Sequence, residues 1–230
     1  MKPPSTPVPR LSIIVPVLDE ATRIQGFLGA LQPWRGLAEI IVVDGGSRDA
    51  SMALASQLCD HCLLAERGRA RQMNAGAELA SGDTLMFLHA DTELLISPAD
   101  MAAALDGKPA WGYFGARLSG KAVAFRVIER MMSLRSRLTR IATGDQALFV
   151  SRRLWEQCGG FADIPLMEDV EMCKRLRRLA EPTLPPRPVR TSSRRWEEKG
   201  ILRTVLLMWS LRLRYWLGAS PEALARAYRG

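Results

Sequence analysis

The sequence has few cysteines and histidines and no apolar run long enough to cross a membrane. Its 230 residues include four Cys and two His. Such a low cysteine count is typical of a reduced cytoplasmic protein, which is the location we expect. A spanning helix needs about 20 apolar residues, whereas segment 201–217 is interrupted by three arginines. Segment 1–10 is proline-rich and lacks the apolar stretch of a secretory signal.

Three common site motifs are also missing or incomplete. Cys59-Asp60-His61-Cys62 has the CxxC form, but no second pair follows it, and it closes a predicted helix where redox pairs usually open one. We therefore interpret these cysteines as structural. The chain has no GxGxxG loop and no Walker lysine after its first apolar segments, which disfavours dinucleotide and P-loop sites.

Charge is distributed unevenly along the chain. Residues 1–114 carry 9 basic and 13 acidic side chains, a net −4, whereas residues 115–230 carry 23 and 11, a net +12. An acidic half suits metal-assisted chemistry, and a basic half suits phosphates, anionic lipid headgroups or nucleic acid. The basic half has no base-stacking aromatic array or known nucleic-acid motif, which disfavours a nucleic-acid partner.

Four short apolar segments, each followed by a polar turn, predict an α/β fold with a parallel sheet. Strands are predicted over 11–15, 38–43, 62–65 and 85–88, and helices over 21–31, 50–58 and 72–80. Ligands of such sheets collect at the carboxyl ends of the strands. The candidate site residues at these ends are Pro16, Asp19, Glu20, Asp44, Gly46, His89 and Asp91.

Each of these candidates has a functional and a structural interpretation. His89 and Asp91 share one face of an extended chain, and an imidazole with a carboxylate suits Mn²⁺ better than Ca²⁺; alternatively, the strand merely ends in polar residues. Asp19 and Glu20 either bind a ligand or cap the following helix. The basic turn with Arg69 and Arg71 either pairs with phosphate oxygens or is a solvated loop.

In this order and spacing, the turns resemble those of the family 2 glycosyltransferases, which have the GT-A fold. The matching segments are VPVLDE (15–20), VDGGSRD (43–49), Asn74-Ala75-Gly76, Ser81-Gly82-Asp83 and His89-Ala90-Asp91, the last at the place of the family's DxD. His89 replaces the first acid of DxD, and Asp19 replaces the usual asparagine. The resemblance covers about residues 11–180 and is to short bacterial members without transmembrane helices.

A second match lies further along the chain. Gly159-Gly160-Phe161 is followed by Glu168-Asp169 and a predicted helix. The resemblance implies that Asp169 is the general base, with Glu168 its nearest competitor. An acceptor alcohol is a poor nucleophile until a base takes its proton. The alternative is that Asp169 caps the helix.

The resemblance implies an inverting enzyme that transfers a sugar from a nucleotide diphosphate sugar, a UDP-sugar being favoured, to a hydroxyl acceptor that a lipid can carry. It implies a Rossmann-like, mostly parallel sheet flanked by helices, and a divalent cation, Mn²⁺ or Mg²⁺, on Asp91 and His89. The implied donor-binding residues are Pro16, Asp19, Glu20, Asp44, Gly46, Arg69, Arg71, Asp145 and Gln146.

The basic half is expected to contain a strand at 111–118 and an amphipathic helix at 121–140. The apolar residues of that helix either cover the sheet or face anionic lipid; they are Val123, Val127, Met131, Leu134 and Leu138. The segment 191–196 with Arg195-Trp196 resembles a loop of processive relatives, although Ser192 replaces their glutamine; we expect a loop that contacts diphosphate or acceptor. Segment 201–217 lies either on the protein's core or on a membrane, with Trp209 and Trp216 as anchors.

We therefore expect a flexible N-terminus (1–10), a GT-A catalytic domain (11–190) and a basic, apolar helical extension (191–230), with a peripheral position at the inner membrane face. Two other functions are considered. A sugar-phosphate nucleotidyltransferase has a similar sheet, but a glycine-rich, lysine-containing loop stands where this chain has VPVLDE. A non-catalytic nucleotide-sugar or lipid-binding module would explain the altered DxD.

Overall fold

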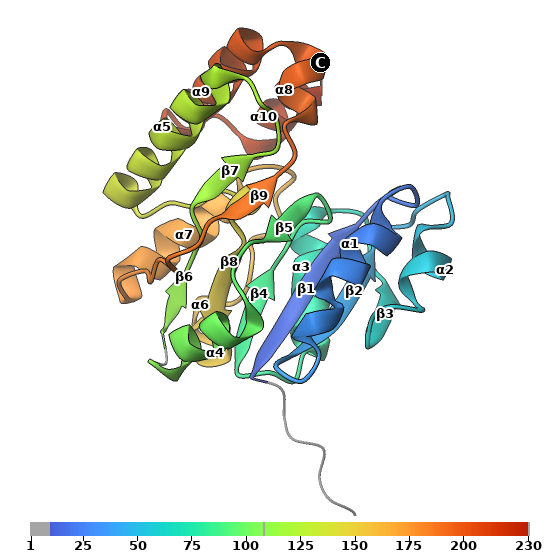
Figure 1. Ribbon diagram of the computed structural model, residues 1–230. Coiled ribbons are helices and arrows are strands. Elements are labelled where there is room, and N and C mark those ends of the chain that lie inside the picture. Colours follow the sequence, from blue (N-terminus) through green and yellow to red (C-terminus); the bar gives the residue numbers. More distant parts are fainter. Residues whose placement is uncertain (1–9, 108, 230) are drawn as a thin grey trace, which may run out of the picture.

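The computed structural model describes residues 10–107 and 109–229, so most of the predicted N-terminal segment 1–10 lies outside the described residues. A six-stranded sheet in the order β3-β2-β1-β4-β8-β6 forms the centre of the molecule (Figure 1). Its parallel strands are β1 (Leu11–Val17), β2 (Ala38–Asp44), β3 (His61–Leu64) and β4 (Thr84–Phe87). β8 (Leu148–Ser151) pairs antiparallel with β4 and with β6 (Trp111–Gly112). The predicted α/β class with a mostly parallel sheet is confirmed.

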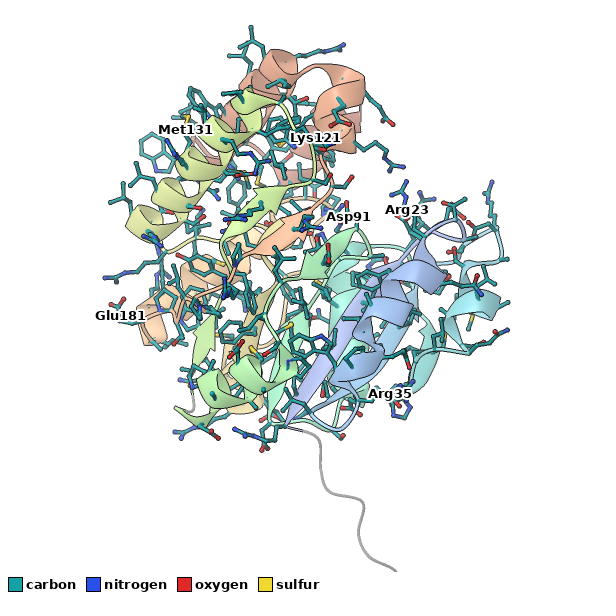
Figure 2. All side chains as sticks on the ribbon, in the orientation of Figure 1. Arg23, Arg35, Asp91, Lys121, Met131 and Glu181 are labelled. Atoms are coloured by element: carbon teal, nitrogen blue, oxygen red, sulfur yellow. The ribbon has the colours of Figure 1, made fainter. Side chains whose placement is uncertain are left out.

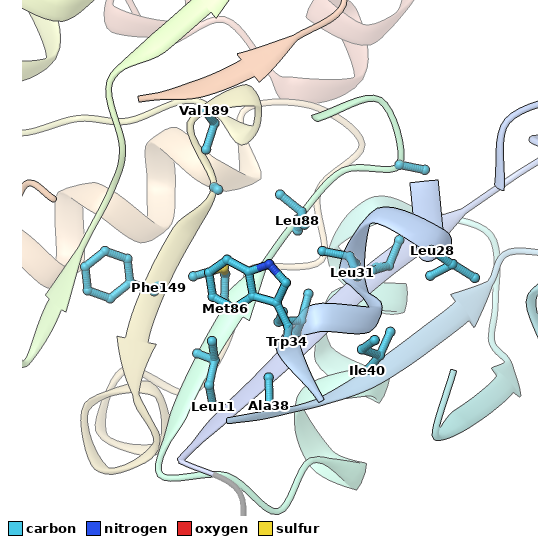
Figure 3. Packing of buried hydrophobic residues seen from close by; sticks show 14 of the residues in the cluster. Leu11, Leu28, Leu31, Trp34, Ala38, Ile40, Met86, Leu88, Phe149 and Val189 are labelled. Carbon is cyan, nitrogen blue, oxygen red and sulfur yellow. The ribbon is translucent and has the colours of Figure 1, made fainter. Parts of the chain in front are cut away.

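Two apolar layers cover the two faces of this sheet because successive side chains of a strand point to opposite faces. On one face, Leu11 and Met86 pack with Trp34, as Figure 3 shows. On the other face, Ile14 packs with Met73. The flanking elements are α1 (Ile24–Leu31), η1 (Gln32–Trp34), α2 (Ser51–Ala55), α3 (Arg69–Leu79), α4 (Pro98–Asp106), α6 (Arg152–Cys158) and α7 (Glu168–Leu179).

The glycine of Asn74-Ala75-Gly76 has a packing role in α3. A Cβ at Gly76 would lie 2.5 Å from Cγ2 of Ile14 and 2.9 Å from Cγ2 of Val43. The absence of a side chain therefore lets α3 approach β1 and β2 closely, and α3 begins at the carboxyl edge of the sheet, where the site lies.

A second, three-stranded sheet corrects the prediction of one strand over 111–118. It contains β5 (Thr92–Leu94), β9 (Val189–Thr191) and β7 (Ala116–Leu118), with β9 antiparallel to β5 and parallel to β7. The chain leaves the first sheet after β6 because the next two amides bond elsewhere: the Tyr113 amide donates to Thr183 O and the Phe114 amide to Gln146 O. β9 also crosses the predicted boundary at residue 190.

Several helices of the basic half form a layer beside this second sheet (Figure 1). This helical layer consists of α5 (Val123–Thr139), η2 (Gly144–Gln146), α8 (Arg194–Lys199), α9 (Ile201–Trp216) and α10 (Pro221–Arg229). α8 occupies part of the segment predicted as a loop. Across the described ranges, every helix is too short or too polar to cross a membrane.

α5 packs on β7 of the second sheet, but the residues of its predicted apolar stripe are not the ones that make this contact. Phe125 and Ile128 are its buried apolar residues, packed with Leu118 of β7 and against α8 and α9. All five residues of the predicted stripe are exposed: Val123, Val127, Met131, Leu134 and Leu138. α5 therefore has two apolar faces: one is buried in the protein, and the other is exposed on its surface.

Candidate active site

A cavity of about 780 Å³ lies between the carboxyl ends of β1 and β4 and the helical layer. The sheet side contributes Glu20 after β1, His89 and Asp91 after β4, and Arg69 at the start of α3. The opposite side is formed by residues of α5, η2, α7, α8, α9 and α10. The position is the one expected for a ligand site of a parallel sheet.

Carboxylates gather around one guanidinium in this cavity. Burial raises the pKa of Glu168 to about 7; the negative charge of Asp169 adds to the rise, and Arg69 opposes it. Burial alone would lower the pKa of Arg69, but the surrounding carboxylates, Glu168 above all, raise it. Asp91, Glu168 and Asp169 all act on this single guanidinium, so the part of the cavity around Arg69 is suited to a cation or to a proton-accepting carboxylate.

Asp169 is held at the beginning of α7 by two backbone amides. The Gly144 amide donates to its Oδ2 at 2.6 Å, and the Val170 amide donates to its Oδ1 at 2.6 Å. Burial is the main cause that raises the pKa of this carboxyl, and the two amides work against the rise. Met167, just before α7, has φ 72°, a left-handed conformation that is costly for a non-glycine residue. The turn aims Glu168 and Asp169 into the cavity.

His89 and Asp91 have different surroundings. Burial, with Arg69 nearby, lowers the pKa of His89 to about 3, so its imidazole is neutral and has a free nitrogen lone pair. It packs against Gly144, where a Cβ would lie 2.3 Å from its Cε1. Asp91 faces the cavity (Figure 2). Burial and then the charge of Asp145 raise the pKa of Asp91, so a cation bound there would relieve repulsion between the two carboxylates.

Asp44 lies buried at the carboxyl end of β2. Its Oδ1 accepts from the Gly46 amide at 2.6 Å and from the Ser47 amide at 2.7 Å. Its Oδ2 is buried and has no hydrogen-bond partner in the described part of the chain. A buried acceptor oxygen without a donor is costly, and it matches a ligand N–H or O–H. Asp19, with φ 54°, lies close by and accepts from the Arg48 amide.

The structure brings most of the predicted site residues together, but not all of them. Glu20, Arg69, His89, Asp91, Asp145, Glu168 and Asp169 line the cavity. Pro16, Asp19, Asp44 and Gly46 lie at the neighbouring ends of β1 and β2, outside that lining.

Two predicted donor-binding residues have structural partners instead. Arg71 pairs with Asp163 at 2.8 Å and with Glu66 at 2.6 Å, and it does not line the cavity. It lies two residues after Arg69 on α3, so the two side chains point to different sides of the helix. Gln146 is fully buried, and its side chain bonds to Ser136 and to Phe114 O. It fixes η2 against α5.

Sequence reasoning missed two arginines of the opposite wall, Arg135 on α5 and Arg212 on α9. Burial and then the charge of Arg212 lower the pKa of Arg135 to about 10. Within the described ranges Arg212 makes no hydrogen bond or ion pair, and Nε of Arg135 is buried without a partner. An anionic ligand would offset the repulsion between them. No local motif marks them, because each belongs to a helix whose inner face only the tertiary structure defines.

The region with Arg194-Arg195-Trp196 also lines the cavity, in α8. The guanidinium of Arg195 stacks on the ring of Tyr228 at 3.7 Å and donates to Tyr228 O at 3.1 Å. This pairing joins α8 to α10, so the end of the described chain helps to close the cavity.

Comparison with known proteins defines the class. The family profile described as "Glycosyl transferase family 2" matches residues 12–151. The chain is 31% identical over 199 residues to the uncharacterized glycosyltransferase Rv1514c of Mycobacterium tuberculosis, covering 77% of this chain and 72% of that protein. The protein therefore belongs to glycosyl transferase family 2 and is a transferase enzyme. It covers only 37% of the length of the first curated relatives it matches, mycobacterial PGL/p-HBAD biosynthesis glycosyltransferases, at 33% identity.

Solved structures share the fold at low sequence identity. Staphylococcus aureus TarS 1–349 in complex with UDP-GlcNAc superimposes with a TM-score of 0.64 at 17% identity, over 80% of this chain and 58% of that one. The mannosyltransferase PcManGT of Pyrobaculum calidifontis, in complex with GDP-Man and Mn²⁺, superimposes with a TM-score of 0.61 at 22% identity, over 80% and 56%. The GT-A fold expected from the resemblance is thereby confirmed.

Proposed function

We propose that the protein is an inverting, metal-assisted glycosyltransferase that moves a sugar from a nucleotide diphosphate sugar to a hydroxyl group. The observation that supports this most is the meeting of Asp169, Asp91, His89 and Arg69 in one cavity of a family 2 fold. The domain assignment is part of the proposal: residues 11–190 form the catalytic domain, and the extension 191–230 completes its cavity.

The donor nucleoside is proposed to lie along the ends of β1 and β2, with a UDP-sugar favoured because TarS was solved with UDP-GlcNAc. The unpartnered Oδ2 of Asp44 offers an acceptor for a base N–H. Pro16, Asp19, Glu20 and Gly46 complete this end of the proposed donor site. In this arrangement Arg69 would lie on the diphosphate side of the donor site.

Asp91 and His89 are proposed to hold a divalent cation, Mn²⁺ or Mg²⁺. No group of three His, Cys, Asp or Glu able to hold a metal occurs among residues 10–107 and 109–229. Two protein donors still fit, because such cations in phosphate sites take one or two protein ligands and complete their shell with phosphate oxygens and water. A bound cation would supply charge stabilisation for the departing diphosphate. PcManGT was solved with Mn²⁺.

Asp169 is proposed to accept the proton of the acceptor hydroxyl. Its two backbone amides fix the carboxylate, and burial keeps its pKa raised, which increases its basicity. Attack of the acceptor oxygen in one in-line displacement forms the new glycosidic bond as the bond to the diphosphate breaks. The configuration at the anomeric carbon is inverted, and no covalent enzyme intermediate is required.

The acceptor is proposed to be a hydroxyl carried by a lipid, with the enzyme peripheral at the inner membrane face. What supports a lipid is the apolar part of the cavity lining, formed by residues such as Ile128, Met131, Leu166, Met208 and Trp209. Arg135 and Arg212 in the same wall are suited to an anionic group, either of the acceptor or of the diphosphate.

The test combines ligand binding with one substitution. UDP, GDP, CDP and TDP, each with and without Mn²⁺, are added to the protein in thermal-shift measurements; one nucleotide is expected to raise the unfolding temperature, and to do so more with Mn²⁺. Asp169→Asn should then lower the rate of sugar transfer or of donor hydrolysis by about 10²–10⁴-fold while the nucleotide shift stays. If no nucleotide shifts the unfolding temperature, the proposed donor site is wrong; a non-catalytic module would bind the donor without turning it over.

A further inference from the structure

Helices α5 and α9 each expose a continuous apolar stripe. On α5 it comprises Val123, Val127, Met131, Leu134 and Leu138, and on α9 it comprises Leu202, Leu206, Trp209, Leu213 and Trp216, followed by Leu217. Four of these side chains are more than 70% exposed: Val123 80%, Leu138 76%, Leu202 72% and Trp216 77%. Spacings of three and four residues place each set on one face of its helix. Large exposed apolar faces of this kind mark interaction sites.

The two stripes flank the same opening. The inner faces of the helices pack together, with Phe125 and Ile128 of α5 against Ile201 and Val205 of α9. Met131 and Trp209 are exposed members of their stripes and also line the catalytic cavity. In Figure 2, Met131 lies on the outer side of α5. A flat apolar surface placed on the two stripes would therefore lie next to the cavity that holds Asp169.

The exposed charges on these helices are all positive. α5 and α9 contain a single acidic residue, Glu129, which is buried and accepts from the Leu118 amide at 2.7 Å. The exposed basic side chains beside the stripes are Arg126, Arg130, Arg137, Arg203 and Arg214. In the described part of the chain, only Arg126 among these five is in an ion pair, with Glu129. Apolar stripes edged by arginines, with tryptophans in them, match the interface of an anionic bilayer.

We propose that α5 and α9 together form a docking surface for an anionic phospholipid bilayer, called here the α5–α9 surface. The ten stripe residues insert at the headgroup boundary, the arginines face lipid phosphates, and the cavity opens toward the membrane plane between Met131 and Trp209. This inference rests on the proposed function, because it takes from it the lipid-carried acceptor. With the α5–α9 surface on the membrane, an acceptor hydroxyl in the headgroup region would reach Asp169 without leaving the bilayer.

A bilayer fits this surface better than a second copy of the chain. In a symmetric pairing of the α5–α9 surface, each set of arginines would meet the same set of its partner, and neither helix offers an exposed carboxylate to neutralise them. Anionic lipids supply the missing negative charge. Each arginine near such a membrane strengthens binding about fivefold, and salt weakens the effect.

The experiment measures sedimentation of the full chain with phosphatidylcholine vesicles that contain or lack phosphatidylglycerol. Leu138→Ser/Trp216→Ser removes one highly exposed residue from each stripe without touching the cavity lining. The expected result is binding to the anionic vesicles that weakens with salt, and a loss of about a hundredfold in the double variant. Leu64→Ser, at a residue of β3 that is 64% exposed, is the matched control and should bind like the parent protein.

Three results would overturn the proposal. They are equal binding to vesicles with and without phosphatidylglycerol, equal losses in the double variant and the Leu64→Ser control, and a dimer in sedimentation velocity that the double variant abolishes. The UDP-induced thermal shift is measured on the same samples. An unchanged shift in a variant that no longer binds vesicles separates the docking surface from the donor site, so failure of one is distinguishable from failure of the other.

Discussion

Replacing Glu168 by glutamine should make the protein more stable at neutral and basic pH. Glu168 is 5% exposed and lies at the start of α7. Burial, together with the charge of Asp169, raises its pKa from 4.5 to about 7 despite the attraction of Arg69. In the folded protein the carboxyl therefore keeps its proton over a pH range in which the unfolded chain has already released it.

The sign and size of the effect follow from this shift. Below pH 4.5 the carboxyl is protonated in both states and costs the folded protein nothing; as the pH rises through 4.5 toward 7, stability is lost. One pKa unit corresponds to about 1.4 kcal/mol, so the full penalty above pH 7 is about 3 kcal/mol. Glutamine has a similar shape and no charge. Between pH 4 and pH 8 the stability of Glu168→Gln relative to the parent should therefore increase by about 3 kcal/mol.

The assay is urea unfolding of parent and variant over this pH range, in the presence of a constant salt concentration. A difference in unfolding free energy that does not change with pH would refute the reasoning, because it would mean that Glu168 has the same pKa in both states. Transfer activity gives a second readout. If Asp169 is the base, Glu168→Gln should retain transfer; a loss as large as that of Asp169→Asn would make Glu168 the better candidate.

Two further predictions concern the same cavity. Asp91→Ala should abolish the part of the nucleotide thermal shift that depends on Mn²⁺. The part that does not depend on Mn²⁺ should remain, because Asp44 and its neighbours are unchanged. If the effect of Mn²⁺ is the same in the variant, Asp91 does not belong to the proposed metal site. Gly144→Ala would place a Cβ 2.3 Å from Cε1 of His89, so it should cost about 1–3 kcal/mol of stability and impair transfer, as measured by urea unfolding and a transfer assay. Gly29→Ala in α1, where a Cβ meets nothing within 4 Å, is the control and should not destabilise; equal effects of the two changes would contradict the packing argument.

The part of the fold that sequence reasoning predicts well is the first half. The segments that became β1, β2 and β4 are apolar runs followed by polar turns, and their burial on both faces requires that composition. A candidate site residue lies at the carboxyl end of each of these strands, and parallel strands end at the same edge of the sheet. Asp91 and Glu20, 71 residues apart in the chain, consequently line one cavity.

The predictions of secondary structure are wrong where strands pair with partners that are distant in the sequence. β5 and β9 are three residues long and stabilise each other only across the molecule, so neither has a local signal. The single strand predicted over 111–118 is divided between two sheets, because Phe114 bonds to Gln146 and not to a strand neighbour. Arg71 has the same residue type and local setting as Arg69, but the turn of α3 directs it to Asp163 and away from the cavity.

The sequence by itself determined the α/β class, the order of the strands' polar ends and the resemblance to family 2 glycosyltransferases, because these depend on local periodicity and on short motifs. Only the tertiary structure decided that Arg135 and Arg212 face one cavity, that Asp169 takes hydrogen bonds from Gly144 and Val170, and that the stripe of α5 is exposed. The physical reason is that an amphipathic helix specifies which residues share a face, whereas the packing of distant elements decides which face is buried.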